Sequence, residues 1–238
     1  MTRWWSEGCV VRGRAKVLVE LGPIEAPWKL PEGWRWERLD TVAPVNPPRK
    51  FDSIPSDAEL TFLPMAAVAE LTGRLDLGAK RPVSAVKSGY TRFRSGDVIF
   101  AKITPCMENG KLAIIPDLPY GMGAGSTEFH VLEPEDVNAM YLFYWLSQVS
   151  FRNDAEHNMT GTAGQKRVST EWLRRSVIPV PPNEMQNRLI KKIGDLFSQL
   201  EVGEGLLSEV GSIEPYQGLI GTLRQSILAA AFRGSLSV

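Results

Sequence analysis

The C-terminal third of this chain repeats apolar residues at the spacing of a two-stranded coiled coil, and this pattern constrains the fold most. After Pro181-Pro182, apolar side chains return at intervals of three and four over residues 183–210, with Gly203 as the weak position. Asn183 and Gln186 have the capping-box spacing, which predicts that a helix begins here. The seam of this helix consists of Met185, Leu189, Ile193, Leu196, Leu200, Gly203, Leu207 and Val210.

A second helix is predicted after a break at Gly211-Ser212, because Pro215 is tolerated only in a first helical turn. Its seam continues with the same spacing through Tyr216, Ile220, Leu223, Ile227 and Ala230. The two helices form either a hairpin that closes the chain's own core or a coiled coil that holds a second protein chain. The length of the seam favours the coiled coil. Within this helical region, 183–238, the predicted dimer or subunit interface consists of Leu189, Ile193, Leu196, Leu200, Leu207, Ile220, Leu223 and Ile227.

The residues before the helices predict an α+β domain. Residues 1–28 form an extension of unclear role, and residues 29–182 form the domain itself. β-Branched content with flanking Gly or Pro predicts strands, and one long apolar segment predicts a helix packed against a sheet. The segments do not alternate regularly between strand and helix, which argues against a doubly wound fold. The strands are predicted at 97–103, 111–116, 126–134 and 176–181, and the helix at 139–149.

The formal net charge is zero, from 27 basic and 27 acidic residues, which taken alone argues against a nucleic-acid partner. The charges are nevertheless segregated. Residues 80–111 hold seven bases and two acids, whereas residues 112–150 hold five acids and no base. A charge run is most often a solvated face. Here, however, Gly, Ser, Thr and aromatic residues separate the bases, as in KSGYTRFRSGD, and this composition can bind phosphates or bases.

Composition excludes several classes of protein. No apolar run reaches the 18 or so residues needed to cross a bilayer, and the Arg-containing N-terminus lacks the apolar stretch of a secretory signal. Two cysteines, Cys9 and Cys106, cannot form a disulfide framework, and His130 and His157 have no neighbours for a metal site. We therefore expect a cytoplasmic protein without membrane association, metal or cofactor.

No segment matches a complete catalytic motif, so we predict no catalytic residue. Asn46-Pro47-Pro48 resembles the Asn-Pro-Pro-aromatic motif of amino-methyltransferases, but Arg49 replaces the aromatic residue that stacks on the flipped base. The glycine-rich segment 120–125 follows prolines rather than a strand, so turn glycines are expected there. A degenerate S-adenosylmethionine-dependent DNA methyltransferase remains one alternative. A coiled-coil interaction protein without DNA binding remains another.

Six segments, in order, resemble the specificity subunit of type I restriction-modification systems. They are LPEGWRWERL (30–39), GDVIFAKITPCMENGKLAII (96–115), GSTEFHVL (125–132), TGTAGQKRVS (160–169), IPVPPNEMQ (178–186) and LRQSILAAAFRGSL (223–236). The chain departs from the family at 181–186, where it has PPNEMQ instead of the usual Pro-Pro-x-x-Glu-Gln. It also contains one recognition module, where the family usually has two.

The resemblance implies a non-catalytic protein in which a target-recognition domain precedes a conserved helical region. Its partners would be double-stranded DNA, a type I DNA methyltransferase (modification) subunit and a restriction subunit that is a motor-nuclease. Adenine methylation or cleavage would take place in those subunits. The half-length chain would be either a fragment or a natural half-subunit that works as a homodimer.

A recognition domain needs cations for phosphates and hydrogen-bonding groups for base edges. The basic segment and the polar loop 160–167 supply both, and glycines 161 and 164 would let this loop approach a backbone closely. The predicted phosphate contacts are Lys80, Lys87, Arg92, Arg94, Lys102 and Lys111. The predicted loop contacts are Gln165, Lys166 and Arg167 with the hydroxyl donors Thr160 and Thr162, and the predicted base-edge readers are Tyr90 and Asn109.

The length of the predicted helix 183–210 can be compared with one turn of DNA. Its 28 residues span about 42 Å at 1.5 Å per residue, somewhat more than one turn of B-DNA at ~34 Å. Two modules held antiparallel by such helices would contact two short half-sites separated by an uncontacted spacer. Because a homodimer is two-fold symmetric, the expected target is a bipartite, near-palindromic site.

Overall fold

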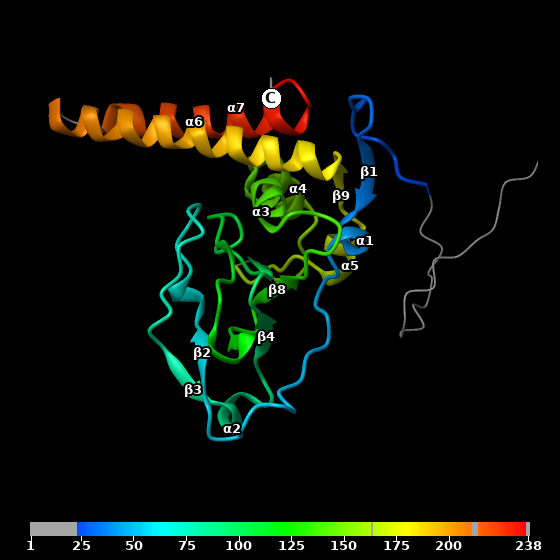
Figure 1. The fold of residues 1–238 in the computed structure, drawn as a ribbon, viewed down its shortest axis with the longest axis vertical. Helices are drawn as coiled ribbons and strands as arrows, with labels where there is room; N and C mark the ends of the chain where they lie inside the picture. The colour runs from blue at the N-terminus through cyan, green and yellow to red at the C-terminus, as the bar shows by residue number, and fades with distance from the viewer. Residues whose placement is uncertain (1–22, 163, 211–213, 237–238) are drawn as a thin grey trace, which may run out of the picture.

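Helices form one side of the molecule and strands the other. The computed structural model describes residues 23–162, 164–210 and 214–236. Figure 1 shows α6 (Asn183–Val210) and α7 (Glu214–Phe232) running side by side, with α3 (Ala139–Ser147) and α4 (Val149–His157) packed beneath them and the larger sheets beyond. The predicted α+β class with a C-terminal helical region is confirmed. Among the described helices, none has the length and apolar character needed to cross a bilayer.

The sheet farthest from α6 and α7 has four strands. Its order is β3 (Lys80–Pro82), β2 (Glu59–Leu63), β7 (Met122–Gly125) and β4 (Thr91–Arg94). β7 is parallel to β2 and antiparallel to β4. The short helix α2 (Val83–Val86) follows β3, and apolar residues of α2 and β2 share a small core on the outer face of this sheet.

The glycines of β7 correct one prediction, since residues 122–125 form a strand inside the sheet and not a turn. A Cβ on Gly125 would lie 2.5 Å from the carbonyl oxygen of Leu63, and a Cβ on Gly123 would overlap the ring of Phe93. Glycine is required because the neighbouring strand and this ring occupy the side-chain space. The backbone turn predicted for the glycine-rich segment is limited to Tyr120 and Gly121, which both have positive φ.

A second sheet of three strands lies between the four-stranded sheet and the helices. Its order is β6 (Leu112–Ile114), β5 (Val98–Ala101) and β8 (Phe129–Leu132), which confirms three of the predicted strands. Side chains of β5 alternate between two cores. Val98 and Phe100 join the core under the helices, and Ile99 and Ala101 join the core shared by the two sheets.

The fourth predicted strand, β9 (Val177–Val180), pairs antiparallel with β1 (Arg35–Arg38) and so closes the domain immediately before α6. The short helices α1 (Leu39–Val42) and α5 (Thr170–Arg175) contact each other next to this pair. Trp28 packs against Trp36 with ring centroids 4.7 Å apart. The end of the predicted N-terminal extension therefore belongs to the core, while residues 1–22 lie outside the described part of the chain.

The helix predicted at 139–149 is α3, which ends two residues earlier than expected, and a separate helix, α4, begins at Val149. α3 begins at its cap Asn138, whose side chain accepts from the amide of Met140, and ends at Ser147. Gln148 then takes an extended conformation with ψ 138°. The amide of Val149 donates to Oε1 of Gln225 on α7 at 2.8 Å, in place of a carbonyl one helical turn back. Gln225 of α7 therefore caps the first amide of α4 at the break.

α6 and α7 form an antiparallel hairpin within one chain, and its inner end packs on the domain. Leu189 and Ile193 of the predicted interface are buried in the chain's own core with Phe232. Gln186 does not complete the predicted capping box. Its side-chain oxygen accepts from the amide of Asn138 at 2.9 Å, which ties α6 to α3.

The outer end of the hairpin projects beyond the domain, as Figure 1 shows. Of the predicted interface residues, Leu196, Leu200 and Ile227 are half-buried and Ile220 is buried, whereas Leu207 and Leu223 are exposed. Four further apolar side chains on this end are also exposed, namely Val202, Leu206, Tyr216 and Leu219. The predicted break at Gly211-Ser212 lies outside the described residues.

Candidate nucleic-acid interface

The polar loop 160–167, called here the tip loop, folds back on itself. Thr160 and Arg167 exchange two backbone hydrogen bonds of 3.0 and 2.8 Å. The returning arm then lies along residues 102–104, where the amide of Thr104 donates to the carbonyl of Lys166 at 3.1 Å. The segment that follows β5 therefore fixes the returning arm, and the pairing with Arg167 fixes the Thr160 end.

A side-chain ion pair adds a second attachment. Nη2 of Arg167 lies 2.8 Å from Oε1 of Glu128, and Nε lies 3.0 Å from Oε2, so the guanidinium binds the carboxylate with two prongs. The hydrogen bonds from Arg167 hold the pKa of Glu128 below its ordinary value, and the charge of nearby Lys102 lowers it further. Arg167, predicted as a DNA contact, is thus engaged in shaping the loop.

The remaining predicted residues of the tip loop face solvent. Thr160, Thr162, Gln165 and Lys166 are all exposed, and Lys102 at the base is half-buried. Gly161 has φ +127°, and a Cβ there would lie 2.8 Å from the carbonyl oxygen of Gln165. The described residues of the loop, which exclude residue 163, therefore present one ammonium, one amide and two hydroxyls, the set of groups that phosphates and base edges bind.

The predicted residues on and around β3 and β4 are mostly bound to the protein itself. Nη1 of Arg81 donates to the hydroxyl of Tyr90 at 2.8 Å, and the Arg81 guanidinium lies over the ring of Phe62 at 4.1 Å. Lys80 donates to the hydroxyl of Thr61 at 2.8 Å. Tyr90 is therefore occupied as a packing partner of Arg81, while Lys87 at the end of α2 is exposed.

Arg92 is tied to backbone carbonyls. Its Nη1 donates to the carbonyl of Arg49 at 2.5 Å, and its Nη2 donates to the carbonyl of Lys87. The first bond holds the segment before residue 50 against β4, and the second holds the end of α2, so Arg92 acts structurally. Arg92 is therefore not free to bind a phosphate. The sequence could not show this, because it does not reveal which carbonyls lie near the side chain in the fold.

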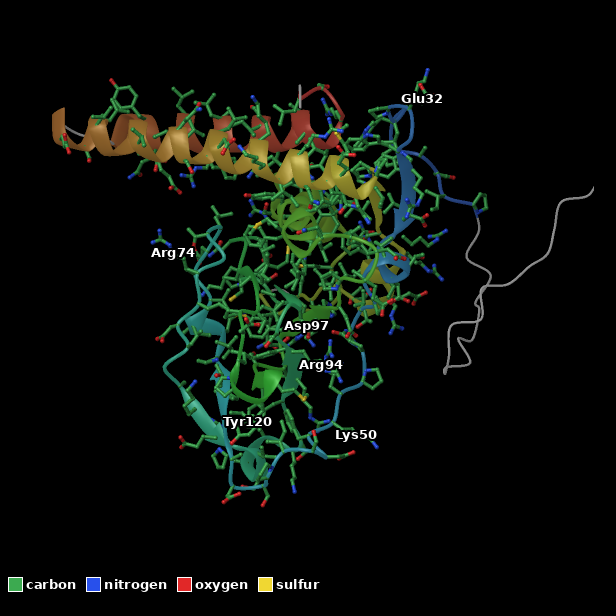
Figure 2. All side chains as sticks on the ribbon, in the orientation of Figure 1. Glu32, Lys50, Arg74, Arg94, Asp97 and Tyr120 are labelled. Carbon is green, nitrogen blue, oxygen red and sulfur yellow. The ribbon has the colours of Figure 1, made fainter. Side chains whose placement is uncertain are left out.

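A buried charge cluster lies beside β4 and was missed by sequence reasoning. Nη2 of Arg49 lies 2.7 Å from Oδ1 of Asp97, with side chains only 1% and 3% exposed. Glu133 approaches the same guanidinium at 3.3 Å and exposed Arg94 at 3.7 Å. Burial raises the pKa of Asp97 to about 6, although the Arg94 amide and the Arg49 guanidinium lower it. In Figure 2, Arg94 and Lys50 lie on the side of the domain opposite Arg74.

Asn109 and Lys111 lie apart from the tip loop and support a neighbouring hairpin. Asn109 donates to Oε1 of Glu70 at 2.8 Å, and Lys111 donates to the carbonyl of Met65 at 3.3 Å. Residues 70 and 111 also form a backbone bridge. Thus the predicted cations do not form one surface, and the structure brings together only Lys102 and the tip loop.

The methyltransferase-like motif has a structural role. Asn46, with φ +53°, donates to Nδ1 of His130 at 3.0 Å and to the hydroxyl of Thr170 at 3.2 Å, while its side-chain oxygen accepts from the amide of Val131. Burial lowers the pKa of His130 to about 4, so the ring is a neutral partner in this network. The Asn46 amide that would orient a target amine is therefore already bonded. With residues 122–125 in a strand, neither half of the methyltransferase template is assembled.

Within residues 23–162, 164–210 and 214–236, no group of three or more His, Cys, Asp or Glu side chains is arranged to hold a metal ion. The fold and the site together define a class of protein: an α+β domain that presents a polar loop from a fixed base and carries a long antiparallel helical pair. A family model for the type I restriction modification DNA specificity domain matches residues 31–211. The chain therefore belongs to that family.

Two curated relatives from Escherichia coli match most of the chain. It is 37% identical over 213 residues to the type I restriction enzyme EcoAI specificity subunit and 36% identical over 216 residues to the EcoEI specificity subunit. Each match covers 88% of this chain and 35% of the relative. The chain thus spans about a third of the length of these relatives.

Solved structures agree with the fold. The HsdS subunit from Thermoanaerobacter tengcongensis superposes with a TM-score of 0.64 at 25% identity, over 77% of this chain and 47% of that chain. A structure from a study of complex assembly and conformational transition of the type I R-M system gives a TM-score of 0.55 at 22% identity, over 88% of this chain and 48% of that chain, and supports the fold alone.

Proposed function

We propose that this chain is a non-catalytic DNA-recognition subunit of a type I restriction-modification complex. The observation that carries the proposal is the tip loop, in a chain of the DNA specificity domain family. Its Gln165 and Lys166 are exposed while the Arg167–Glu128 pair and residues 102–104 fix its base. A fixed base matters because a side chain can discriminate base edges only from a defined position.

The groups of the tip loop suit different parts of DNA. The Lys166 ammonium suits a phosphate, where it displaces counterions, and the Gln165 amide can form two bonds with an adenine edge. The hydroxyls of Thr160 and Thr162 can bind either a phosphate or a base edge. Additional phosphate contacts are assigned to Lys87, Arg94 and Lys102, which are at least partly exposed. We assign Arg167, Arg92 and Tyr90 to positioning, on the contacts described above.

Catalysis is assigned to partner subunits: a DNA methyltransferase subunit that methylates adenine and a restriction subunit that is a motor-nuclease. The proposal places the complex in the cytoplasm, where these partners meet DNA. Two chains would associate as a homodimer through the outer end of the α6–α7 hairpin. The exposed apolar residues of that end, including Leu206 and Leu219, support this assignment because isolated helices rarely leave such residues in water.

The length of α6 supports a bipartite target. Its 28 residues span about 42 Å, so two tip loops held by antiparallel hairpins would reach DNA more than one turn apart. Footprinting of the purified chain with its methyltransferase partner tests this arrangement. Two protected half-sites related by two-fold symmetry are expected, and one continuous asymmetric patch would contradict the dimer.

A further inference from the structure

A long cleft lies between the α6–α7 hairpin and the domain. It has a volume of about 980 Å³. Phe197 and Glu201 of α6 and the face of α7 from Gln217 to Leu228 form its roof, and α3 forms its floor. The turn 71–74 closes one side. Figure 2 shows Arg74 on this turn, which rises toward α6.

One arginine in the wall of this cleft is buried without a counter-ion. Arg152 is 9% exposed, and Nη1 donates to the carbonyl of Glu108. Its Nε has no hydrogen-bond partner, and among the described residues no carboxylate lies within ion-pair distance of it. The Glu108 carboxylate instead accepts from the hydroxyl of Thr104 at 2.7 Å. A buried charge without a partner is costly, which indicates that a missing group completes the site.

Another of the three arginines that line the cleft, Arg224, differs from Arg152. Nε of Arg224 on α7 also lacks a partner, but its Nη2 lies 3.4 Å from Glu204 and 3.9 Å from Glu201, so its charge is balanced within the hairpin. Arg152 faces the same cleft from α4 without such balance. The cleft therefore carries a local positive charge at its α4 end.

Exposed apolar side chains surround this charge. Leu71, 54% exposed with φ +59°, and the rim residues Met140 and Val149 all line the cleft. A Cβ on Gly110 would lie 2.5 Å from Cδ2 of Leu71 and 3.4 Å from Nη1 of Arg152, so these two side chains are neighbours. A ligand that fits this part of the cleft would place a carboxylate on the Arg152 guanidinium and an apolar group on Leu71. A peptide with an acidic residue between apolar residues has both groups.

The shape of the cleft favours a chain segment as its occupant. Its roof follows α7 over the twelve residues 217–228, whose ends lie about 17 Å apart at 1.5 Å per residue. Its lining is mainly apolar, whereas a phosphate group would need several converging donors. We propose that the cleft binds an apolar segment of a partner protein that carries one acidic residue. The carboxylate pairs with Arg152, and apolar residues of the segment cover Leu71, Met140 and Val149.

The experiment uses random twelve-residue peptides displayed on phage and selected on the full chain. We expect the enriched peptides to share an Asp or Glu flanked by apolar residues. Synthetic peptides with that residue changed to Gln or Asn should bind at least tenfold more weakly. Arg152→Met should abolish the preference for the acidic peptide, and Arg152→Lys should retain part of it. Arg188→Met is the matched control, because Arg188 is exposed on α6 and pairs only with Glu184.

Leu71→Asp provides a test that does not alter a buried residue. Aspartate tolerates the positive φ at this position, and its charge would repel the peptide carboxylate, so binding should fall at least tenfold. Enriched peptides without an acidic residue, or acidic peptides that bind Arg152→Met and Leu71→Asp unchanged, would overturn the proposal. If peptides without an acidic residue disrupt the self-association of the chain, the cleft binds a second copy of the chain, and the proposal is overturned as well. The inference does not rest on DNA recognition, since peptide binding is measured without DNA.

Discussion

Arg167 and Glu128 are joined by a two-pronged ion pair, with Nη2–Oε1 at 2.8 Å and Nε–Oε2 at 3.0 Å. This pair attaches the tip loop to the turn before β8. Because both prongs are used within the protein, Arg167 determines where Gln165 and Lys166 stand and contributes little free charge of its own.

Arg167→Lys tests this positioning role, because a lysine keeps the charge but cannot form both prongs. We expect discrimination between specific and random DNA to fall about tenfold, with the salt dependence of binding unchanged. Fluorescence anisotropy at several salt concentrations measures both. Arg175→Lys on α5 makes the same change in an exposed pair with Glu171, away from the tip loop, and should leave both quantities unaltered. A lower salt slope with intact discrimination would identify Arg167 as a phosphate contact instead.

Removing one partner of the buried Arg49–Asp97 pair should cost much stability, because the other partner is then left buried alone. Arg49→Met or Asp97→Asn leaves one buried polar group without its partner and should lower the free energy of unfolding by about 3–5 kcal/mol. The double variant Arg49→Met/Asp97→Leu should lose less free energy of unfolding than the two single variants lose together. Urea denaturation measures these values. Lys50→Met is the control, because Lys50 is 81% exposed and only weakly paired with Asp52, and should cost less than about 0.5 kcal/mol. Equal losses for Lys50→Met and Arg49→Met would contradict the account.

His130 should remain neutral well into acid. Its pKa is lowered from 6.5 to about 4 by burial, so the unfolded state binds a proton first as pH falls. Its contribution to stability is therefore fully present above pH 6.5 and is lost as pH falls toward 4. Asp97 acts in the opposite sense: its pKa is raised from 3.8 to about 6, so its contribution is present below 3.8 and is lost as pH rises through 6.

Between pH 4 and 6 the contributions of His130 and Asp97 therefore change in opposite directions and offset each other. His130→Gln removes the His130 contribution, so the stability of the variant relative to the native chain should fall as pH rises across that range. NMR titration of the His130 ring gives the direct measurement, with an expected midpoint near 4. A midpoint above 6 would show that the ring is not buried as described.

Much of the fold could be predicted from local pattern. The strands at residues 98–101, 112–114, 129–132 and 177–180 were expected because apolar, β-branched residues stand there between breakers. β7 could not be recognised, since its glycines are dictated by Phe93 and the neighbouring backbone and not by a turn. Leu189 and Ile193 have the same spacing whether a helix packs on its own domain or on a second chain.

The candidate site was predicted less well. Exposed Gln165 and Lys166 could be expected from a polar loop with glycines. The roles of three arginines depend on partners more than 35 residues away in sequence. Arg49 binds Asp97, Arg92 binds the carbonyl of residue 49, and Arg167 binds Glu128. Only the bond from Arg92 to Lys87 is local. A basic residue type indicates charge, whereas its partners decide whether that charge is available.

Gly125→Ala tests whether β7 lies between β2 and β4 in the four-stranded sheet. The new methyl group would meet the carbonyl oxygen of Leu63 at 2.5 Å, and overpacking of this kind costs about 1–3 kcal/mol. Gly203→Ala on α6 has open space around the added carbon and should raise stability by up to about 1 kcal/mol. Thermal unfolding of both variants gives the comparison. A neutral Gly125→Ala would mean that these glycines lie in a turn after all.

The central claim is that the tip loop reads DNA sequence, and selection of binding sites from a randomised duplex library tests it most directly. The chain with its methyltransferase partner should select a bipartite motif with two related halves. Gln165→Ala should relax the preference at one base pair of each half by about 1–3 kcal/mol, with the salt slope unchanged. Lys166→Ala should keep the motif and reduce the slope of log K against log salt by about 0.9 per loop. The same motif with the same base preferences from native chain and Gln165→Ala would contradict the claim.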